Sequence, residues 1–433
     1  MTRYKLERAQ LILIAIIALS VLLGIVYVFS VPPGLPYDEP PHFSTVQYYA
    51  TNGRLPVLGA PGTNYEAYQT PLYYSLSAMV DWLVRPLGLR PEFYLLRLSG
   101  LVLLVPLGLF AYRVASRVFG KDSTPALLAT AFVCLNPALL GVASSIQNDM
   151  LAIVFSFWIL DAVGRYVQDS PLSTRTAVQL GALISLAMLT KMTVIFFPIP
   201  IAWFVWSRHG RAAVRYMAIV AGVIVLGTGW WFARNKMLYG DLMGVAAMLK
   251  VVHQPAPHIA LWKPSVLIPY LRNFLAYSWL PVDYFRSLIK SSLWERTIVV
   301  GSTLLAVLGW WIGRKKTEIQ TSEPQDDYRR FLFGAYAVCF GIYFYTYLTK
   351  NSYPPRVVYP MFLAYAVFYS YGLCQVFRRY AKPNGRVAVS VFGMLLIVLS
   401  FAMCRKANAY RTIDFLPEVN HYHQAAVAQQ NRR

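Results

Sequence analysis

Long apolar runs recur along most of this sequence and leave few ways for the chain to fold. About 20 apolar residues in a helix cross a bilayer, and a window of that length gives about eleven spans. The spans are expected at 11–31, 96–117, 124–145, 149–167, 176–190, 192–207, 213–233, 294–312, 330–348, 357–377 and 386–404. Further spans follow the first run and no small-residue cleavage site does, so it is not a signal peptide alone. The sequence therefore predicts an all-α, polytopic membrane protein.

The composition agrees with an integral membrane protein. Of the 433 residues, 57% are hydrophobic and 14% are charged, yet the formal net charge is +21. In a membrane protein this excess of cations favours anionic headgroups and anionic substrates. The polar loops lack interleaved basic and aromatic residues, so no nucleic-acid partner is expected. Cys134, Cys339, Cys374 and Cys404 lie in apolar runs without CxxC spacing, which predicts neither a zinc site nor a disulfide framework.

Basic residues at the ends of the runs predict the orientation of the chain. They precede the first span and fill the short loops on the same side, which places the N-terminus in the cytoplasm. An odd number of spans then places the C-terminus outside. These residues are Arg3, Lys5, Arg8, Arg113, Arg117, Lys121, Arg208, Arg211, Arg215, Arg314, Lys315, Lys316, Arg329, Arg330, Arg378, Arg379, Lys382 and Arg386. We expect a multi-pass protein of the plasma or inner membrane.

Two long loops interrupt the series of spans on the outer side. In the first, residues 32–95, the segments 41–52 and 70–86 mix polar, aromatic and aliphatic residues and predict amphipathic helices in the membrane interface. The second, residues 234–293, is rich in Pro, Tyr and Trp and is also expected to be interfacial. The predicted limits are 1–404 for one transmembrane domain, 317–327 for a flexible cytoplasmic linker and 405–433 for a polar tail.

A short acidic motif follows the first span. Asp38 and Glu39 stand side by side, then Pro40, Pro41 and His42. Proline is tolerated in a first helical turn, so a helix is predicted to begin here with Asp38 at its N-cap. His42 then shares one face with both carboxylates. A simple capping role would explain Asp38 and Glu39 but not His42.

Other polar residues are predicted to reach the same outer side from distant parts of the chain. Each has a structural alternative: Lys and Arg can extend to headgroups, an Asn-Asp pair can start a helix, and a loop carboxylate can be solvated. Asp161 is interpreted as a residue of the cytoplasmic end. The outer candidates are Glu66, Asn148, Asp149, Lys191, Arg234 and Arg356.

This set of residues suits the transfer of a group carried on a lipid phosphate. A carboxylate can act as general base on an acceptor hydroxyl, and cations can bind the phosphate leaving group. Glu39, His42 and Glu66 offer ligands for a divalent ion such as Mg²⁺ or Mn²⁺. The sequence has no Walker loop and no GxGxxG motif, which argues against a nucleotide-linked donor.

The ordered motifs resemble those of the GT-C superfamily of polytopic glycosyltransferases, on the branch with protein O-mannosyltransferases and aminoarabinose transferases. The likeness covers about residues 1–375. Two positions depart from the family pattern, where Tyr68 replaces a His and Thr70 replaces a Pro. The matching segments are Asp38 to Phe43, Glu66 to Tyr74, Asn148 to Ala152, Leu189 to Lys191, Arg234-Asn235 with Tyr239 to Asp241, and Arg356 to Pro360.

The resemblance implies an inverting transferase that uses a polyprenyl-phosphate-linked sugar on the extracytoplasmic side. The acceptor would be a glycan, a lipid or a protein, and the sequence names neither it nor the sugar. A transporter or flippase for a lipid-linked substrate is one alternative, and a non-catalytic scaffold is another. The expected roles are Asp38 and Asp149 in catalysis, Glu39, His42 and Glu66 at a metal, Lys191, Arg234 and Arg356 on the donor phosphate, and Tyr65, Gln69, Asn148 and Tyr353 on substrate.

Overall fold

The computed structural model describes residues 2–36, 38–120, 123–168, 173–252, 264–281, 292–314, 323–350, 355–380 and 385–409. Throughout these ranges the regular elements are helices and none is a β-strand, which confirms the predicted all-α fold. The α-helices are α1 (Thr2–Ser30), α2 (Glu39–Asn52), α3 (Pro71–Val84), α4 (Leu89–Leu101), α5 (Leu104–Phe119), α6 (Ser123–Cys134), α7 (Pro137–Ala143), α8 (Asp149–Gln168), α9 (Thr174–Thr190), α10 (Pro198–His209), α11 (Ala213–Tyr239), α12 (Val245–Val251), α13 (Pro264–Tyr277), α14 (Leu293–Arg314), α15 (Glu323–Lys350), α16 (Phe362–Tyr380) and α17 (Gly385–Asn408). Short 3₁₀ helices are η1 (Tyr65–Tyr68), η2 (Arg85–Leu87), η3 (Met192–Phe196), η4 (Gly210–Ala212) and η6 (Pro355–Met361).

The helices form a multi-pass membrane protein. Seven segments of the described chain are long and apolar enough to cross a bilayer, or eight with one bent pair. The eleven predicted spans are therefore not confirmed as a number, although a helix covers each predicted position. The seven are Arg8–Ser30, Leu89–Phe119, Asp149–Val167, Met192–Tyr239, Leu293–Gly313, Val357–Tyr380 and Val387–Asn408.

The bent pair, α6 and α7, lies in the centre of the bundle and turns by 52° between Cys134 and Pro137. Pro137 has no N–H to continue α6, and the Oδ1 of Asn136 instead accepts hydrogen bonds from the first amides of α7. Helix α6 packs against α1, α5, α16 and α17. Its Phe132 is fully buried among aromatic rings that include Trp279 and Tyr369. The two halves of this predicted span therefore serve as core.

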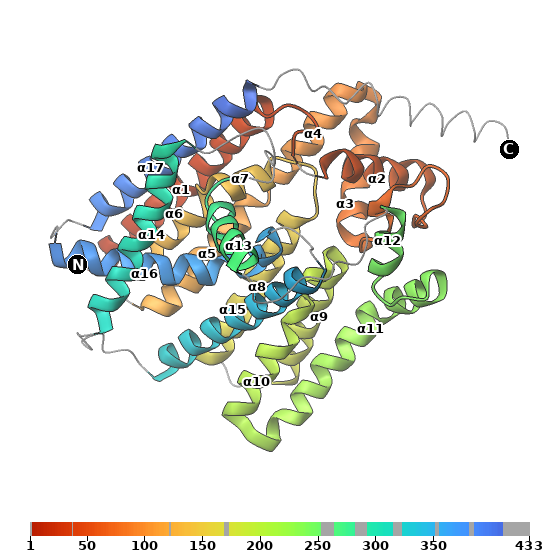
Figure 1. Cartoon of the computed structure of the whole chain (residues 1–433). Coiled ribbons are helices and arrows are strands. Elements are labelled where there is room, and N and C mark those ends of the chain that lie inside the picture. Colours follow the sequence, from red (N-terminus) through yellow and green to blue (C-terminus); the bar gives the residue numbers. More distant parts are fainter. Residues whose placement is uncertain are drawn as a thin grey trace.

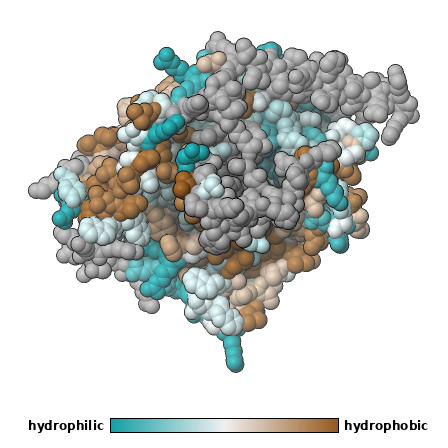
Figure 2. All heavy atoms as spheres, viewed as in Figure 1, coloured by the Kyte–Doolittle hydropathy of each residue, from teal (hydrophilic) through white to brown (hydrophobic). Residues whose placement is uncertain are grey.

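Glycine allows α14 and α16 to cross closely. A Cβ on Gly309 would lie 1.7 Å from the carbonyl oxygen of Gly372, and a Cβ on Gly372 would lie 2.0 Å from that of Ala306. Small residues at such a crossing let helix backbones touch in a membrane. The outer side of α14 is apolar and exposed, as on α1 and α17, and Figure 2 shows this brown surface on the left of the view.

At one end of the bundle, α2, α3, α4 and η1 form a separate layer, which lies at the upper right of Figure 1. We call this the α2 end. Its small core holds Phe43, Val46, Tyr74 and Phe93. Helices α2 and α3 confirm that the segments 41–52 and 70–86 are helical. The turn from α10 to α11, at the bottom of Figure 1, marks the opposite end.

Two predicted limits need correction. The predicted linker 317–327 is partly wrong, because α15 already begins at Glu323. The last helix continues to Asn408, past the predicted boundary at 404. The polar tail from residue 410 onward, and residues 253–263 and 282–291 of the second long loop, lie outside the described residues.

Candidate active site

Asp38 stands at the entrance to α2 in an unusual backbone conformation. It is the one residue other than glycine with positive φ in the described chain, at 64°. Its side chain makes no cap hydrogen bond to α2, although it occupies the N-cap position before Pro40 and Pro41. The Oδ1 atom instead accepts a 2.5 Å hydrogen bond from the Tyr65 hydroxyl. The left-handed conformation, which costs about 1–2 kcal/mol for an L-residue, therefore turns this half-buried carboxylate toward η1.

Glu39, the next residue, is buried and fully engaged. Its two oxygens accept hydrogen bonds at 2.8 and 2.6 Å from the Arg97 guanidinium. They also accept from the backbone amides of Gly34 and Ile146. Arg97 is 0% exposed and also donates to the carbonyls of Val28, Val31 and Pro32 at the end of α1. Glu39 therefore fixes the start of α2 against α1 and α4, and this geometry does not fit the predicted metal-ligand role.

His42 and Glu66 approach each other within the α2 end. His42 Nδ1 forms a 2.6 Å hydrogen bond with the Tyr74 hydroxyl and lies 3.9 Å from Glu66 Oε2. Burial, and then the Glu66 carboxylate, raise the pKa of Tyr74 well above its usual value, so the phenol keeps its proton. Asn64 caps η1 and accepts from the Glu66 amide at 2.7 Å, which fixes Glu66 at this position.

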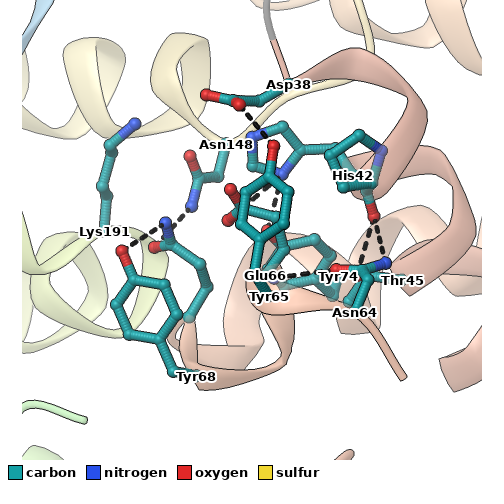
Figure 3. Close-up of polar contacts among 12 residues, drawn as sticks. Asp38, His42, Thr45, Asn64, Tyr65, Glu66, Tyr68, Tyr74, Asn148 and Lys191 are labelled. Carbon is teal, nitrogen blue, oxygen red and sulfur yellow. Dashed lines mark hydrogen bonds and ion pairs between the residues drawn. The ribbon is translucent and has the colours of Figure 1, made fainter. Parts of the chain in front are cut away.

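The short helix η1 connects this acidic group to the bundle. Tyr65 at its start holds Asp38, and Gln69 at its end accepts a 3.3 Å hydrogen bond from Asn148 Nδ2. Gln69 also donates to the Tyr68 hydroxyl at 3.4 Å. Figure 3 shows these side chains around one region, with Asp38 and His42 on one side and Lys191 and Tyr68 on the other. The structure therefore supports the prediction that distant polar residues meet here for Asp38, Tyr65, Gln69 and Asn148.

Asn148, Asp149 and Lys191 form the bundle side of the site. Asp149 begins α8, and Lys191 lies in the extended break between α9 and η3. Their side chains form a 2.7 Å ion pair and are only 3% and 9% exposed. Asn148 also donates to the Thr190 carbonyl, while its buried Oδ1 lacks a hydrogen-bond partner among the described residues. A buried acceptor of this kind suits a substrate hydroxyl.

Arg234 reaches the α2 end of the bundle from the end of α11. Its Nη2 donates a 2.6 Å hydrogen bond to the Pro56 carbonyl, and its guanidinium lies 4.9 Å from the centre of the Trp231 ring. Its Nη1 is buried and, in the part of the chain that the structure describes, has no hydrogen-bond partner. Burial raises the pKa of Tyr49 above its usual value, and the nearby Arg234 guanidinium offsets part of that rise. Arg234 therefore has a donor available beside the loop that follows α2.

The remaining predicted positions are described in part. The backbone of Arg356 lies in η6, and its side chain lies outside the described residues. Tyr353 falls outside the described residues altogether. The predicted roles of both stay predictions.

The metal ligand set does not fit as predicted. With Glu39 engaged by Arg97, only His42 and Glu66 of the three predicted ligands approach each other. No group of three or more His, Cys, Asp or Glu side chains suited to a metal occurs among the described residues. Two protein ligands do not form a closed metal site, although Mg²⁺ often takes one or two carboxylates and completes its shell with waters and substrate phosphates. The requirement for Mg²⁺ or Mn²⁺ stays a prediction, and no step below depends on it.

Arg97 and Tyr74 are the contributors that the sequence did not single out. Arg97 stands within an apolar run, and a cation there needs a partner, which is a signal that could have paired it with an acid. Tyr74 is one of several tyrosines in its segment and has no such signal. Only the packing of α2 on α3 selects it for His42.

One family model matches part of the chain. It is described as dolichyl-phosphate-mannose-protein mannosyltransferase and matches residues 89–231, less than half of the sequence. The matched range contains Asn148, Asp149 and Lys191 and ends before Arg234. No curated protein matches the chain by sequence.

Solved structures of three membrane transferases share the fold. ArnT from Cupriavidus metallidurans bound to undecaprenyl phosphate has a TM-score of 0.54 at 12% identity, over 96% of this chain and 79% of that one. The Archaeoglobus fulgidus oligosaccharyltransferase in complex with zinc and sulfate scores 0.53 at 14% identity, over 91% and 53%. The mycobacterial arabinofuranosyltransferase AftD scores 0.51 at 15% identity, over 91% and 27%. These findings confirm the GT-C-like fold.

Proposed function

We propose that this chain is a membrane glycosyltransferase of the GT-C type that uses a polyprenyl-phosphate-linked sugar. The acceptor is a hydroxyl of a glycan, lipid or protein, and the site faces the extracytoplasmic side of the plasma or inner membrane. The observation that carries the proposal is η1, which joins the Asp38 carboxylate to the Asn148, Asp149 and Lys191 group. The likeness to ArnT, solved with undecaprenyl phosphate, supports a lipid-phosphate donor.

In the proposed reaction, Asp38 is the general base. Asp38 is more exposed than the carboxylates around it. Glu39, Glu66 and Asp149 are at most 4% exposed, whereas Asp38 is half-buried. Its carboxylate takes the proton of the acceptor hydroxyl while that oxygen attacks the anomeric carbon. The bond from that carbon to the phosphate oxygen breaks, and polyprenyl phosphate leaves with the bonding electrons. Attack opposite the leaving group inverts the anomeric centre.

The cations stabilise the leaving phosphate. Among the described residues, the ion pair with Asp149 engages one of the three N–H donors of Lys191, and Arg234 Nη1 has no hydrogen-bond partner. Charge-assisted hydrogen bonds from such buried cations strengthen as negative charge develops on the phosphate. Arg356 is proposed for the same role from η6. Asp149 orients Lys191, while Asn148, Gln69 and Tyr65 are placed to bind hydroxyl groups of the sugar or the acceptor.

The test is the Asp38→Asn variant, reconstituted in vesicles. The probes are undecaprenyl-phosphate-linked mannose, glucose and arabinose with a cell-envelope fraction as acceptor, and released undecaprenyl phosphate is measured by mass spectrometry. The wild type should consume one donor, and Asp38→Asn should lose at least about a hundredfold in rate, as expected for a general base. The control, Asp241→Asn, changes a carboxylate that is bonded to the amides of Met243 and Ala246.

Two outcomes would overturn the proposal. Wild-type turnover by a folded Asp38→Asn protein would show that Asp38 is not the general base. Movement of intact donor across the vesicle membrane, with no bond broken, assigns the chain to lipid transport instead.

A further inference from the structure

A second group of charges lies at the end of the bundle opposite the site. Asp161 of α8 is fully buried and faces three arginines from two helices. Its Oδ2 lies 3.4 Å from Arg113 Nη2 and 3.4 Å from Arg165 Nε, and its Oδ1 lies 3.5 Å from Arg117 Nε. One carboxylate therefore holds three cations together, and the group keeps a net charge of +2.

The outer arginines of this group remain accessible. The side chains of Arg113 and Arg165 are 48% and 43% exposed, whereas that of Arg117 is 16% exposed. Two guanidinium groups on either side of one carboxylate oxygen repel each other, and a further anion would relieve that repulsion. The side chains are thus placed to take an anion from outside the bundle.

An apolar cavity of about 120 Å³ adjoins Arg165. It lies between α8, α9 and α10, and its apolar wall includes Ala162, Leu180, Ile201 and Val205. Gln179 also lines it and is exposed, so the cavity reaches the surface of the bundle. A cavity of about 150 Å³ holds a benzene-sized molecule, so this one takes a short length of hydrocarbon.

We propose that Arg165, Arg113 and this cavity form a binding site for an anionic phospholipid of the leaflet at this end. The headgroup phosphate binds the two exposed guanidinium groups, and part of one acyl chain enters the cavity. Basic residues at the ends of spans are general in membrane proteins, but they do not by themselves sit beside an apolar cavity. The combination of net positive charge and an apolar cavity fits an amphiphile of opposite charge.

The experiment is native mass spectrometry of the full chain in detergent, titrated with dioleoylphosphatidylglycerol or dioleoylphosphatidylcholine. The acyl chains are the same, so only the headgroup charge differs. Arg165→Gln should weaken the tightest phosphatidylglycerol binding about fivefold, and the double variant with Arg113→Gln about 25-fold. Phosphatidylcholine should bind weakly to every variant.

Two further variants make the test decisive. Arg211→Gln removes the same charge from an exposed residue at the same end and should leave binding within about twofold. Gln179→Trp fills the mouth of the cavity, keeps every charge, and should also weaken phosphatidylglycerol binding. It tests the site even if Arg165→Gln does not fold, which size-exclusion chromatography would reveal.

Three results would overturn the proposal. A loss of affinity in Arg211→Gln as large as that in Arg165→Gln would leave only a diffuse basic surface. Phosphatidylcholine could bind as tightly as phosphatidylglycerol, which would make the headgroup irrelevant. Undiminished binding by Gln179→Trp would show that the cavity is not used.

Discussion

Helix α8 carries a buried aspartate toward each end, and the two differ in their partners. Asp149, in the first turn, pairs with Lys191 at 2.7 Å, and both side chains are buried. Asp161, about 18 Å along the helix, meets three arginines at 3.4–3.5 Å, two of them half-exposed. At the α2 end the aspartate of α8 is therefore matched one to one at a short distance. At the opposite end positive charge exceeds negative charge beside a cavity.

The difference shows that residue type alone does not determine how much a buried acid contributes to stability. A short, buried, one-to-one pair has few other groups to compensate it, so loss of one partner is costly. A carboxylate with several half-exposed partners is compensated by the rest and by water. The predictions below test this contrast.

The largest effect is expected for Arg97→Met at the α2 end. This change leaves Glu39 buried with its two backbone amides but without its counter-charge. Breaking a buried pair from one side costs about 3–5 kcal/mol. Thermal unfolding of the purified protein should show a drop of that order in the free energy of unfolding.

The double variant Glu39→Gln/Arg97→Met is its control. With both charges removed, most of the lost stability should return, because the cost comes from the uncompensated carboxylate. Equal stability of the single and double variants would contradict the one-to-one interpretation. Transfer activity should stay low in both, because Glu39 directly follows Asp38 and its bonds to Arg97 hold the start of α2.

Lys191→Met should lower the rate of transfer, in addition to the stability lost when Asp149 is left buried without its counter-charge. It removes a cation proposed for the donor phosphate, and loss of one such group typically lowers kcat by about 10²–10³-fold. Initial rates at saturating donor would measure this, with Lys191→Arg as the variant that keeps the charge. A Lys191→Met enzyme with unchanged kcat would leave the 2.7 Å pair with Asp149 as a structural contact only.

Asp161→Asn should cost less stability than Arg97→Met, about 1 kcal/mol. The half-exposed Arg113 and Arg165 can be solvated when the carboxylate is lost, so the loss is screened. The net charge rises by one, and phosphatidylglycerol affinity should therefore increase about fivefold. A decrease in phosphatidylglycerol affinity would contradict the proposal that net positive charge at this site binds the lipid headgroup.

The sequence predicted elements whose signals are local. Pro40 and Pro41 marked the start of α2, and the apolar runs located the helices of the bundle. The bend at Pro137 was also marked locally, but the run around it was taken as one span.

Contacts between distant residues could not be predicted in this way. Glu39 and Arg97 are 58 positions apart, and their pairing depends on how α4 packs against the loop after α1. The predicted face shared by Asp38, Glu39 and His42 likewise divides in the structure. The positive φ of Asp38 sends its side chain to Tyr65, while Glu39 binds Arg97 and His42 binds Tyr74.

The smallest effect is expected for Arg113→Gln. Asp161 keeps Arg117 and Arg165, and the replaced side chain is already half-exposed. The free energy of unfolding should therefore change by no more than about 0.5 kcal/mol, as for other exposed ion pairs. Thermal unfolding beside Arg97→Met would measure the contrast directly. A loss as large as that of Arg97→Met would mean that Asp161 depends on one arginine, and the two ends of α8 would then follow the same rule.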